Sequence, residues 1–232
     1  DSFPLYYRNI KITKRRSKMR KNLTEIVFIL DMSGSMYSLV QDTIGGYNSM
    51  IGKQRYIKGD VLVSTVLFNN DQKVIHDRVK LQEVPMLTDH EYEPHGCTAL
   101  LDAIGSAIHH IGNIHKYARD EDVPEHTVFV ITTDDLENAS RIYSSSTVKT
   151  MIKRQKEKYG WEFIFLGANI DAADTAEGLG IDQDNAVDYI ADPIGTKACY
   201  DATSDAIFSI RSAGKLNKKW KGTLEEDYKT RK

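Results

Sequence analysis

Runs of apolar residues alternate along the chain with stretches in which apolar residues recur every three or four positions. Three runs are continuous and end in polar residues, as expected for strands buried on both faces of a sheet. They are EIVFILD (25–31), TVFVITTDD (127–135) and WEFIFLGAN (161–169). DVLVSTVLFNN (60–70) is apolar and β-branched, and AVDYIA (186–191) is short. The pattern predicts a strand at each of these five places.

QKVIHDRVKL (72–81) alternates more strongly and follows the turn-like NND directly after the strand predicted at 60–70. Two strands joined by so short a turn pair as a hairpin. The segment is therefore predicted to be an antiparallel strand at the edge of the sheet.

Five further segments have the spacing of helices with one apolar face. They cover residues 39–56, 99–118, 146–160, 171–180 and 196–215. Gly45 and Gly46 interrupt the first, where they either weaken the helix or let another element pack closely.

Strands and helices alternate, which predicts an α/β fold. We expect a Rossmann-like, doubly wound and mostly parallel sheet of about six strands, with one antiparallel edge strand and helices on both faces. In such sheets ligands bind beyond the carboxyl ends of the strands. Asp31 and Asp134 close two predicted strands, and the loop before residue 99 is expected at the same edge.

The charges are unevenly distributed, although the net charge of the 232 residues is only −2. Residues 1–21 contain eight Lys or Arg and one acidic residue. Residues 215–232 contain seven Lys or Arg and three acidic residues. The body between them has 16 basic and 29 acidic residues. We therefore divide the chain into a basic N-terminal tail (1–21), a folded domain (22–214) and a basic C-terminal tail (215–232). Such tails either bind anionic partners or lie in solvent or on their own acidic body.

No apolar run approaches the roughly 20 residues of a membrane-spanning helix. The N-terminal segment is basic and lacks an apolar signal core, so we expect a cytoplasmic protein. Cys97 and Cys199 are expected to be free thiols, small and partly buried, since two cysteines make no disulfide framework.

Five oxygen-bearing side chains converge on the predicted carboxyl edge of the sheet. They are Asp31, Ser33, Ser35, Thr98 and Asp134. Hard cations such as Mg²⁺ prefer oxygen ligands, and two carboxylates balance a divalent charge. Four of the five also have a structural interpretation: Asp31 as a strand end, the serines as turn formers and Thr98 as the N-cap of the following helix.

These residues resemble the motifs of the von Willebrand factor type A (vWA) domain. DMSGS (31–35) resembles its D-x-S-x-S motif, Thr98 in GCTAL its threonine loop, and Asp134 in TTDD its T-D-G motif. The resemblance spans roughly residues 23–212 and suggests a bacterial-type cytoplasmic member of the family. It implies a metal-ion-dependent adhesion site (MIDAS) for Mg²⁺ or Mn²⁺, with Ca²⁺ as a further option. By this resemblance Ser33, Ser35 and Thr98 ligate the ion directly, and Asp31 and Asp134 act largely through water.

One position departs from the family pattern, because Asp135 stands where the family usually has Gly. Asp tolerates left-handed backbone angles better than most residues. Its carboxylate is expected either to strengthen cation binding or to repel an acidic ligand. Among the histidines, His95 is the candidate neighbour of the site, whereas His109, His110 and His115 lack the i, i+4 spacing of a metal pair.

The resemblance implies a divalent-cation-dependent module that binds an acidic residue of a protein partner, and not an enzyme. The sequence contains no nucleophile elbow, phosphate loop or dinucleotide fingerprint. A phosphoaspartate enzyme is disfavoured because Ser occupies position 33. Two alternatives stay open: nucleic-acid binding through the basic tails, and metal-assisted hydrolysis.

Overall fold

A single six-stranded sheet forms the centre of the computed structural model, which describes residues 19–232. The strands lie in the order β3-β2-β1-β4-β5-β6. All neighbouring pairs are parallel except β2 and β3, which form the predicted antiparallel hairpin. The strands are β1 (Arg20–Asp31), β2 (Asp60–Phe68), β3 (Gln72–Lys80), β4 (Pro124–Thr133), β5 (Glu162–Ala168) and β6 (Ala186–Tyr189). The fold class predicted from the sequence is confirmed.

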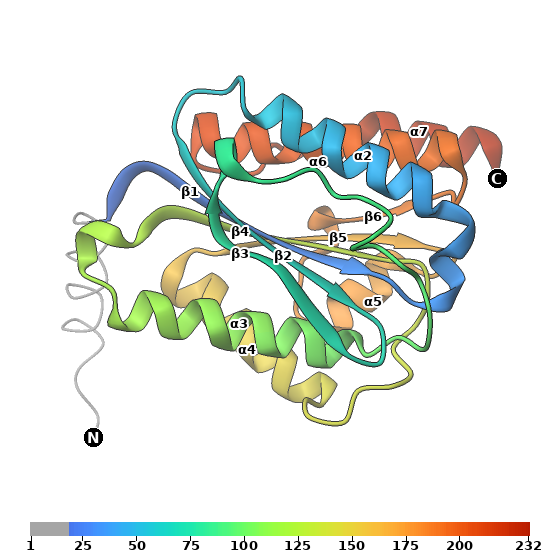
Figure 1. Ribbon diagram of the computed structural model, residues 1–232, viewed down its shortest axis with the longest axis horizontal. Helices are drawn as coiled ribbons and strands as arrows, with labels where there is room; N and C mark the ends of the chain where they lie inside the picture. The colour runs from blue at the N-terminus through green and yellow to red at the C-terminus, as the bar shows by residue number, and fades with distance from the viewer. Residues whose placement is uncertain (1–18) are drawn as a thin grey trace.

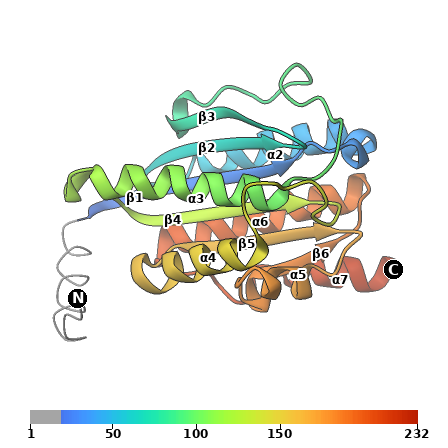
Figure 2. The same cartoon turned by 90° about the horizontal axis from the view of Figure 1, so that it is seen from below.

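Helices cover both faces of the sheet, in two layers (Figures 1 and 2). One layer consists of α2 (Val40–Gln54), α6 (Pro193–Ala213) and α7 (Gly222–Arg231). The other consists of α3 (Leu100–Tyr117), α4 (Ser145–Tyr159) and α5 (Ala172–Gly178). Four short 3₁₀ segments complete the described elements: η1 (Gly34–Leu39), η2 (Leu81–Glu83), η3 (Asp120–Asp122) and η4 (Gln183–Asn185).

Each face of the sheet has its own hydrophobic core. The residues of β1 alternate between the two: Ile26, Phe28 and Leu30 face the α2 and α6 side, and Val27 and Ile29 face α3 and α4. These side chains are at most 1% exposed. A strand buried on both faces needs apolar residues at consecutive positions, which explains the unbroken run in the sequence.

The edge strand β3 differs because His76 is its one buried residue. Its pairing with β2 is irregular between Val63 and Val66, and Arg78 has a positive φ of 53°. A bulge of this kind bends an edge strand and discourages pairing with another chain.

The C-terminal segment 215–232, which the charge pattern sets apart as a tail, continues the fold in the structure. Trp220 and Leu224 are 5% and 0% exposed and belong to the core on the α2 and α6 side. Helix α7 packs beside α6 and β6, and its Arg231 pairs with Asp192 over 2.6 Å. The domain therefore extends beyond residue 214.

Several cations of this segment are paired within the chain. Lys218 contacts Asp184 over 3.1 Å, and Lys221 donates hydrogen bonds to the backbone oxygens of Gln183 and Ala186. This part of the basic charge lies on the acidic body, which was one of the two expectations for the tails. Most of the N-terminal tail lies outside the described residues, and strand β1 already begins at Arg20.

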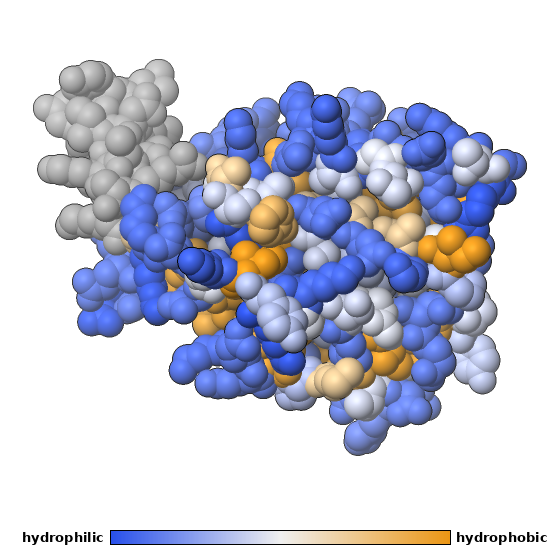
Figure 3. All heavy atoms as spheres, turned by 90° about the horizontal axis from the view of Figure 1, so that it is seen from above, coloured by the Kyte–Doolittle hydropathy of each residue, from blue (hydrophilic) through white to orange (hydrophobic). Residues whose placement is uncertain are grey.

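The surface over α2, α6 and α7 is mainly hydrophilic, and hydrophobic residues occur on it in separate small areas (Figure 3). None of the helices within residues 19–232 combines the length and the apolarity that crossing a membrane requires.

Candidate functional site

Asp31 ends β1 at the centre of the carboxyl edge of the sheet and is 1% exposed. Its Oδ1 accepts a hydrogen bond from the Ser33 backbone N–H over 2.7 Å. Its Oδ2 accepts one from Thr133 Oγ1, on the neighbouring strand β4, over 2.6 Å. Burial raises the pKa of Asp31 to about 6, although these hydrogen bonds favour the ionised form. The carboxylate is thus fixed in position but short of compensating positive charge.

The two serines connect the end of β1 to the end of β4. Ser33 Oγ lies 3.0 Å from Ser35 Oγ, and Ser35 Oγ donates to Asp134 Oδ1 over 2.7 Å. Asp134 is 5% exposed, and its pKa is raised by burial and by the nearby charge of Asp135. Asp31, Ser33, Ser35 and Asp134 therefore form one connected polar cluster.

The loop that carries Thr98 is held against this cluster by backbone hydrogen bonds. The Gly34 N–H donates to the Gly96 oxygen over 3.1 Å, and the His95 N–H donates to the Met32 oxygen over 3.0 Å. A Cβ at Gly34 would lie 3.4 Å from the Gly96 oxygen, which is an ordinary contact distance, so the two loops pack against each other at this point. The Thr98 loop thus lies beside the Ser33–Ser35 turn.

Thr98 is also tied to the segment that follows Asp134. Its N–H donates to Asn138 Oδ1 over 2.9 Å, and its oxygen accepts from the Asn138 N–H over 3.1 Å. The three loops that carry the five candidate residues are therefore connected to one another through hydrogen bonds.

The interpretation of Thr98 as a helix N-cap is wrong. The N-cap position of α3 is Ala99, which makes no side-chain capping hydrogen bond, and two α3 amides are bonded instead by side chains from the loop after β4. Leu101 N–H donates to Glu137 Oε2 over 2.8 Å, and Asp102 N–H donates to Ser140 Oγ over 3.0 Å. Thr98 is 1% exposed, and its hydroxyl has no hydrogen-bond partner among the described residues. A buried hydroxyl without a partner is costly, so this oxygen is available to a ligand.

Asp135, which replaces the family Gly, adopts ordinary backbone angles, since its φ is not positive. Its Oδ1 accepts from the Leu136 N–H over 2.7 Å, and its backbone oxygen accepts from Thr133 Oγ1 over 3.0 Å. The turn therefore does not need the left-handed tolerance that the sequence suggested. The carboxylate adds negative charge beside Asp134.

His95 lies in the Thr98 loop, as the sequence suggested. Its Nε2 is 3.0 Å from Asn69 Nδ2, and its Nδ1 is 2.7 Å from the Glu93 backbone oxygen. These contacts hold the ring to the loops around the cluster. Cys97 is exposed, contrary to the expected partial burial, whereas Cys199 is buried, which raises the pKa of its thiol.

The three histidines of α3 have separate surroundings. His109 is exposed, and His110 Nε2 lies 2.9 Å from Asp77 Oδ1. His115 is buried and bonded to Glu25, which also pairs with Arg78 over 2.8 Å. Within residues 19–232 there is no group of three or more His, Cys, Asp or Glu that could hold a metal. The oxygen cluster does not count as such a group, because it contains only two carboxylates, those of Asp31 and Asp134. Its other members are the hydroxyls of Ser33, Ser35 and Thr98.

Three residues that support the cluster were not identified from the sequence. Thr133 and Tyr92 donate hydrogen bonds to the carboxylate and the backbone oxygen of Asp31, and Asn138 holds Thr98. Thr133 lies next to Asp134 in the sequence, which was a usable signal. Tyr92 and Asn138 lie in loops, and no pattern in the sequence marks them.

The donor set suits a hard divalent cation. It offers carboxylate and hydroxyl oxygens and no nitrogen or thiolate, as Mg²⁺ or Mn²⁺ prefers. The buried Thr98 hydroxyl lacks a partner, and burial disfavours ionisation of Asp31 and Asp134. A bound cation would give the Thr98 hydroxyl a partner. It would also stabilise the ionised forms of Asp31 and Asp134. The residues therefore fit the ion that the family resemblance implies.

Solved structures with the same fold include several vWA domains. The vWF domain of the type V pilus tip protein Mfa5 from Porphyromonas gingivalis matches with a TM-score of 0.60 at 11% identity, over 84% of this chain and 98% of that one. Proximal thread matrix protein 1 from the mussel byssus matches with a TM-score of 0.55 at 14% identity. That match covers 78% of this chain and 45% of the byssus protein, so the chain spans less than half its length.

A third match is the byssus protein with a zinc-occupied MIDAS motif, at a TM-score of 0.54 and 14% identity over 78% of this chain and 44% of that one. No protein-family model matches the sequence, and no curated protein matches it. The structural matches show a vWA-like α/β fold.

Proposed function

We propose that the chain is a divalent-cation-dependent protein-binding module. Asp31, Ser33, Ser35, Thr98 and Asp134 would hold the ion. The observation that carries the proposal is the Thr98 hydroxyl, which is buried without a partner on a loop bonded to both halves of the Asp31–Asp134 cluster. Thr43, Thr132 and Thr196 also have buried hydroxyls without a partner within residues 19–232, but Thr98 lies on the loop bonded to the oxygen cluster, where a bound ion would account for it.

The side chains divide into those that would contact the ion and those that orient them. The hydroxyls of Ser33, Ser35 and Thr98 are neutral, so they add ligands without adding negative charge. Asp31 holds the Ser33 backbone and Asp134 holds the Ser35 hydroxyl, over 2.7 Å in each case. Partners of this kind orient metal ligands in proteins. When bound, a divalent cation supplies an electrophilic position for a carboxylate of a protein partner.

We propose Mg²⁺ as the resident ion, with Mn²⁺ able to replace it. The support is the all-oxygen donor set, together with the shared fold of the zinc-occupied byssus protein. Asp135 contributes to the negative charge around Asp134. We expect this charge to favour partners whose acidic residue is accompanied by basic ones.

We propose binding, and not catalysis, as the role of the site. The side chains bonded to Asp31 and Asp134 are hydroxyls that hold the carboxylates in place. Neither a histidine nor a cysteine is bonded to these carboxylates among the described residues. The carboxylates thus accept hydrogen bonds from the hydroxyls that position them, and within residues 19–232 neither is paired with a histidine or cysteine as in an activated-nucleophile arrangement.

Thermal unfolding with Mg²⁺, Mn²⁺, Ca²⁺ or EDTA tests the proposal. A cation that binds only the folded state at about 100 times its Kd stabilises it by about 2.7 kcal/mol. We expect Mg²⁺ and Mn²⁺ to raise the Tm of the wild type and Asp31→Ala to abolish the increase. Asp205→Ala is the control, because Asp205 is exposed on α6. An equal response to Mg²⁺ in Asp31→Ala and the wild type would refute the site.

Partner capture from a lysate in Mg²⁺ or EDTA then tests the binding role. We expect the wild type to retain one or more partner proteins in Mg²⁺ and to release them in EDTA. Asp31→Ala should not retain them. Retention that is indifferent to EDTA would contradict a metal bridge even if the ion itself binds.

A further inference from the structure

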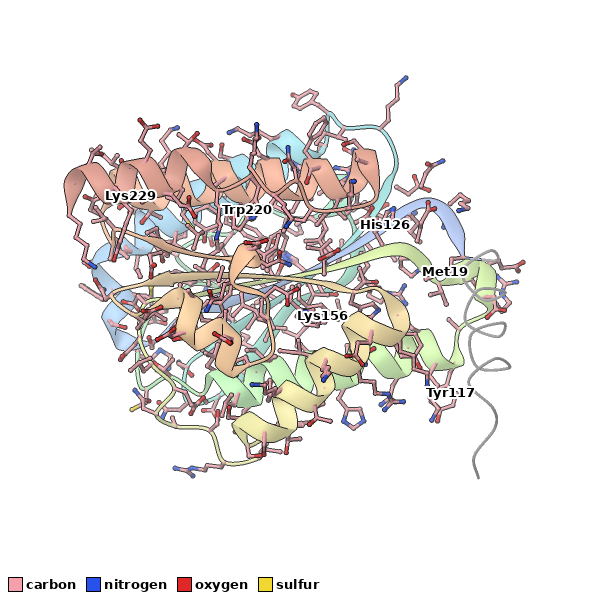
Figure 4. The ribbon with its side chains drawn as sticks, turned by 180° about the vertical axis from the view of Figure 1, so that it is seen from behind. Met19, Tyr117, His126, Lys156, Trp220 and Lys229 are labelled. Carbon is pink, nitrogen blue, oxygen red and sulfur yellow. The ribbon has the colours of Figure 1, made fainter. Side chains whose placement is uncertain are left out.

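A second candidate binding site lies at the opposite edge of the sheet from the oxygen cluster. It is a cavity of about 290 Å³ between the C-terminal halves of α3 and α4. Met19, Val123 and Trp161, which line it, directly precede β1, β4 and β5. Figure 4 shows Met19 and Tyr117, at the end of α3, on this side of the molecule. Since the three strands are parallel, the cavity and Asp31 lie at opposite ends of them.

The inner wall of the cavity is apolar and aromatic. Trp161 is 4% exposed, stacks on Phe129 at a centroid distance of 5.2 Å, and meets the edge of His115 at 5.4 Å. Ile108 and Met151 add aliphatic surface from α3 and α4. An apolar body of a ligand would therefore be buried against a rigid wall.

The rim of the cavity carries cationic side chains, and the buried carboxylate of Glu25 is bonded to its His115. Its ionisable side chains are His109, His115, Lys116, Arg154, Lys158 and Tyr159, with no Asp or Glu among the lining residues. Lys116 and Lys158 lie in the last turns of α3 and α4, where cations favour the helix dipole. That role does not explain Arg154, which lies one turn earlier and forms no ion pair with any residue from 19 to 232.

Two polar groups in the wall have hydrogen-bonding capacity to spare. Gln155 is 9% exposed, and its side-chain amide makes no hydrogen bond within the described part of the chain. The same holds for the indole N–H of Trp161. Both groups line the open cavity, where a polar ligand can replace the water that reaches them.

We infer that this cavity binds a small monocarboxylate with an apolar body. The aromatic wall takes the body, and Arg154 and Lys158 attract the carboxylate, which accepts hydrogen bonds from the unused donors. The volume equals that of roughly ten water molecules. This space suits a medium-chain fatty acid or an aryl-alkanoic acid better than a long-chain lipid.

Decanoate and its uncharged counterpart decanol are suitable probes for the full chain. Trp161 reports binding by fluorescence, and Trp220→Phe removes the other of the two tryptophans. Calorimetry on the wild type checks the affinity independently. We expect saturable binding of decanoate at one site, weaker binding of decanol, and an affinity for decanoate that falls as salt is added.

Arg154→Gln with Lys158→Gln tests the charge, and Gln155→Leu tests the amide. We expect the double variant to weaken decanoate binding about tenfold or more, the effect of removing a charge-assisted contact, and to leave decanol unchanged. Lys153→Gln is the matched control, because Lys153 is exposed on the same helix and pairs with Glu157 over 3.8 Å. It should bind decanoate as the wild type does.

Binding should persist in EDTA and in Asp31→Ala, which separates this site from the proposed metal site. The absence of saturable decanoate binding in the wild type would overturn the inference. The inference would also be overturned if decanol bound as tightly as decanoate and the double variant kept the wild-type affinity. The cations would then have no part in recognition.

Discussion

Ser35 Oγ donates a hydrogen bond to Asp134 Oδ1 over 2.7 Å, although the two residues are 99 positions apart in the chain. The contact exists because β1 and β4 are parallel neighbours whose carboxyl ends meet at one edge of the sheet. It joins the turn after β1 to the turn after β4. The Thr98 loop is bonded to both turns, so the candidate metal site depends on the order of the strands as much as on its ligands.

Thr98→Val is the sharpest test of the unpartnered hydroxyl. Valine keeps the shape and removes an oxygen that makes no hydrogen bond, so the free energy of unfolding in EDTA should change by less than about 1 kcal/mol or increase. The stabilisation by Mg²⁺ should fall, because a ligand is lost. Thermal unfolding in EDTA and in Mg²⁺ measures both quantities.

Thr196→Val is the control for Thr98→Val, since the Thr196 hydroxyl is also buried without a partner but lies on α6. It should behave like Thr98→Val in EDTA and keep the full response to Mg²⁺. A marked destabilisation of Thr98→Val in EDTA would mean that the hydroxyl has a structural role.

Gly45 and Gly46 are predicted to respond oppositely to alanine. A Cβ at Gly46 would lie 2.2 Å from Tyr200 Cδ2, whereas one at Gly45 would meet nothing within 4 Å. Gly46→Ala should therefore cost about 1–3 kcal/mol through overpacking between α2 and α6. Gly45→Ala should gain up to about 1 kcal/mol in helix propensity. Denaturant unfolding of the two variants measures the difference, and similar values would contradict the close packing.

Most of the fold could be predicted because its elements follow from local patterns. The central strands are buried on both faces, so their apolar runs are continuous, and the polar residues after Leu30 and Thr133 mark where they leave the core. The sequence also identified residues that meet at one edge, since parallel strands end there. It could not tell which of Gly45 and Gly46 faces Tyr200, because that depends on how α6 packs against α2.

The contacts that position the ligands were less accessible from the sequence. Asn138 and Glu137 act on residues about 40 positions away through loop geometry that no periodic pattern encodes. The C-terminal helix was missed for a different reason. Its segment is rich in Lys, and the charge obscured Trp220 and Leu224, which are four positions apart and both buried.

Trp220→Ala tests whether the C-terminal segment is part of the domain. Removing a buried Trp from the core on the α2 and α6 side should cost about 3–5 kcal/mol. Lys218→Ala is the matched control, since its ion pair with Asp184 is exposed and should contribute less than about 1 kcal/mol. Denaturant unfolding measures both. A Trp220→Ala variant as stable as the wild type would show that the segment behaves as a detachable tail.

The buried histidine His76 should make the stability of the protein depend on pH. It lies on β3, away from both proposed sites. It is 6% exposed on β3, and its Nδ1 lies 3.0 Å from Thr65 Oγ1, which is itself 2.7 Å from the Tyr47 hydroxyl. Burial lowers the pKa of His76 below its ordinary value of 6.5, although Glu91 opposes the shift. Below pH 6.5 the unfolded chain therefore binds more protons at this position than the folded protein does. The contribution of His76 to the free energy of unfolding must decrease as the pH falls through this window.

His76→Gln measures that contribution, because glutamine is polar and does not titrate. The raised pKa of Asp31 gives the folded protein the opposite trend in the same window, so the slope of one protein alone is not diagnostic. Asp31 is present in both proteins, and its effect cancels in the difference between them. Urea unfolding in EDTA at about pH 8 and about pH 5 should show that the wild type loses more stability on acidification than His76→Gln does. Equal losses in the two proteins would mean that His76 is protonated as readily in the fold as in the unfolded chain.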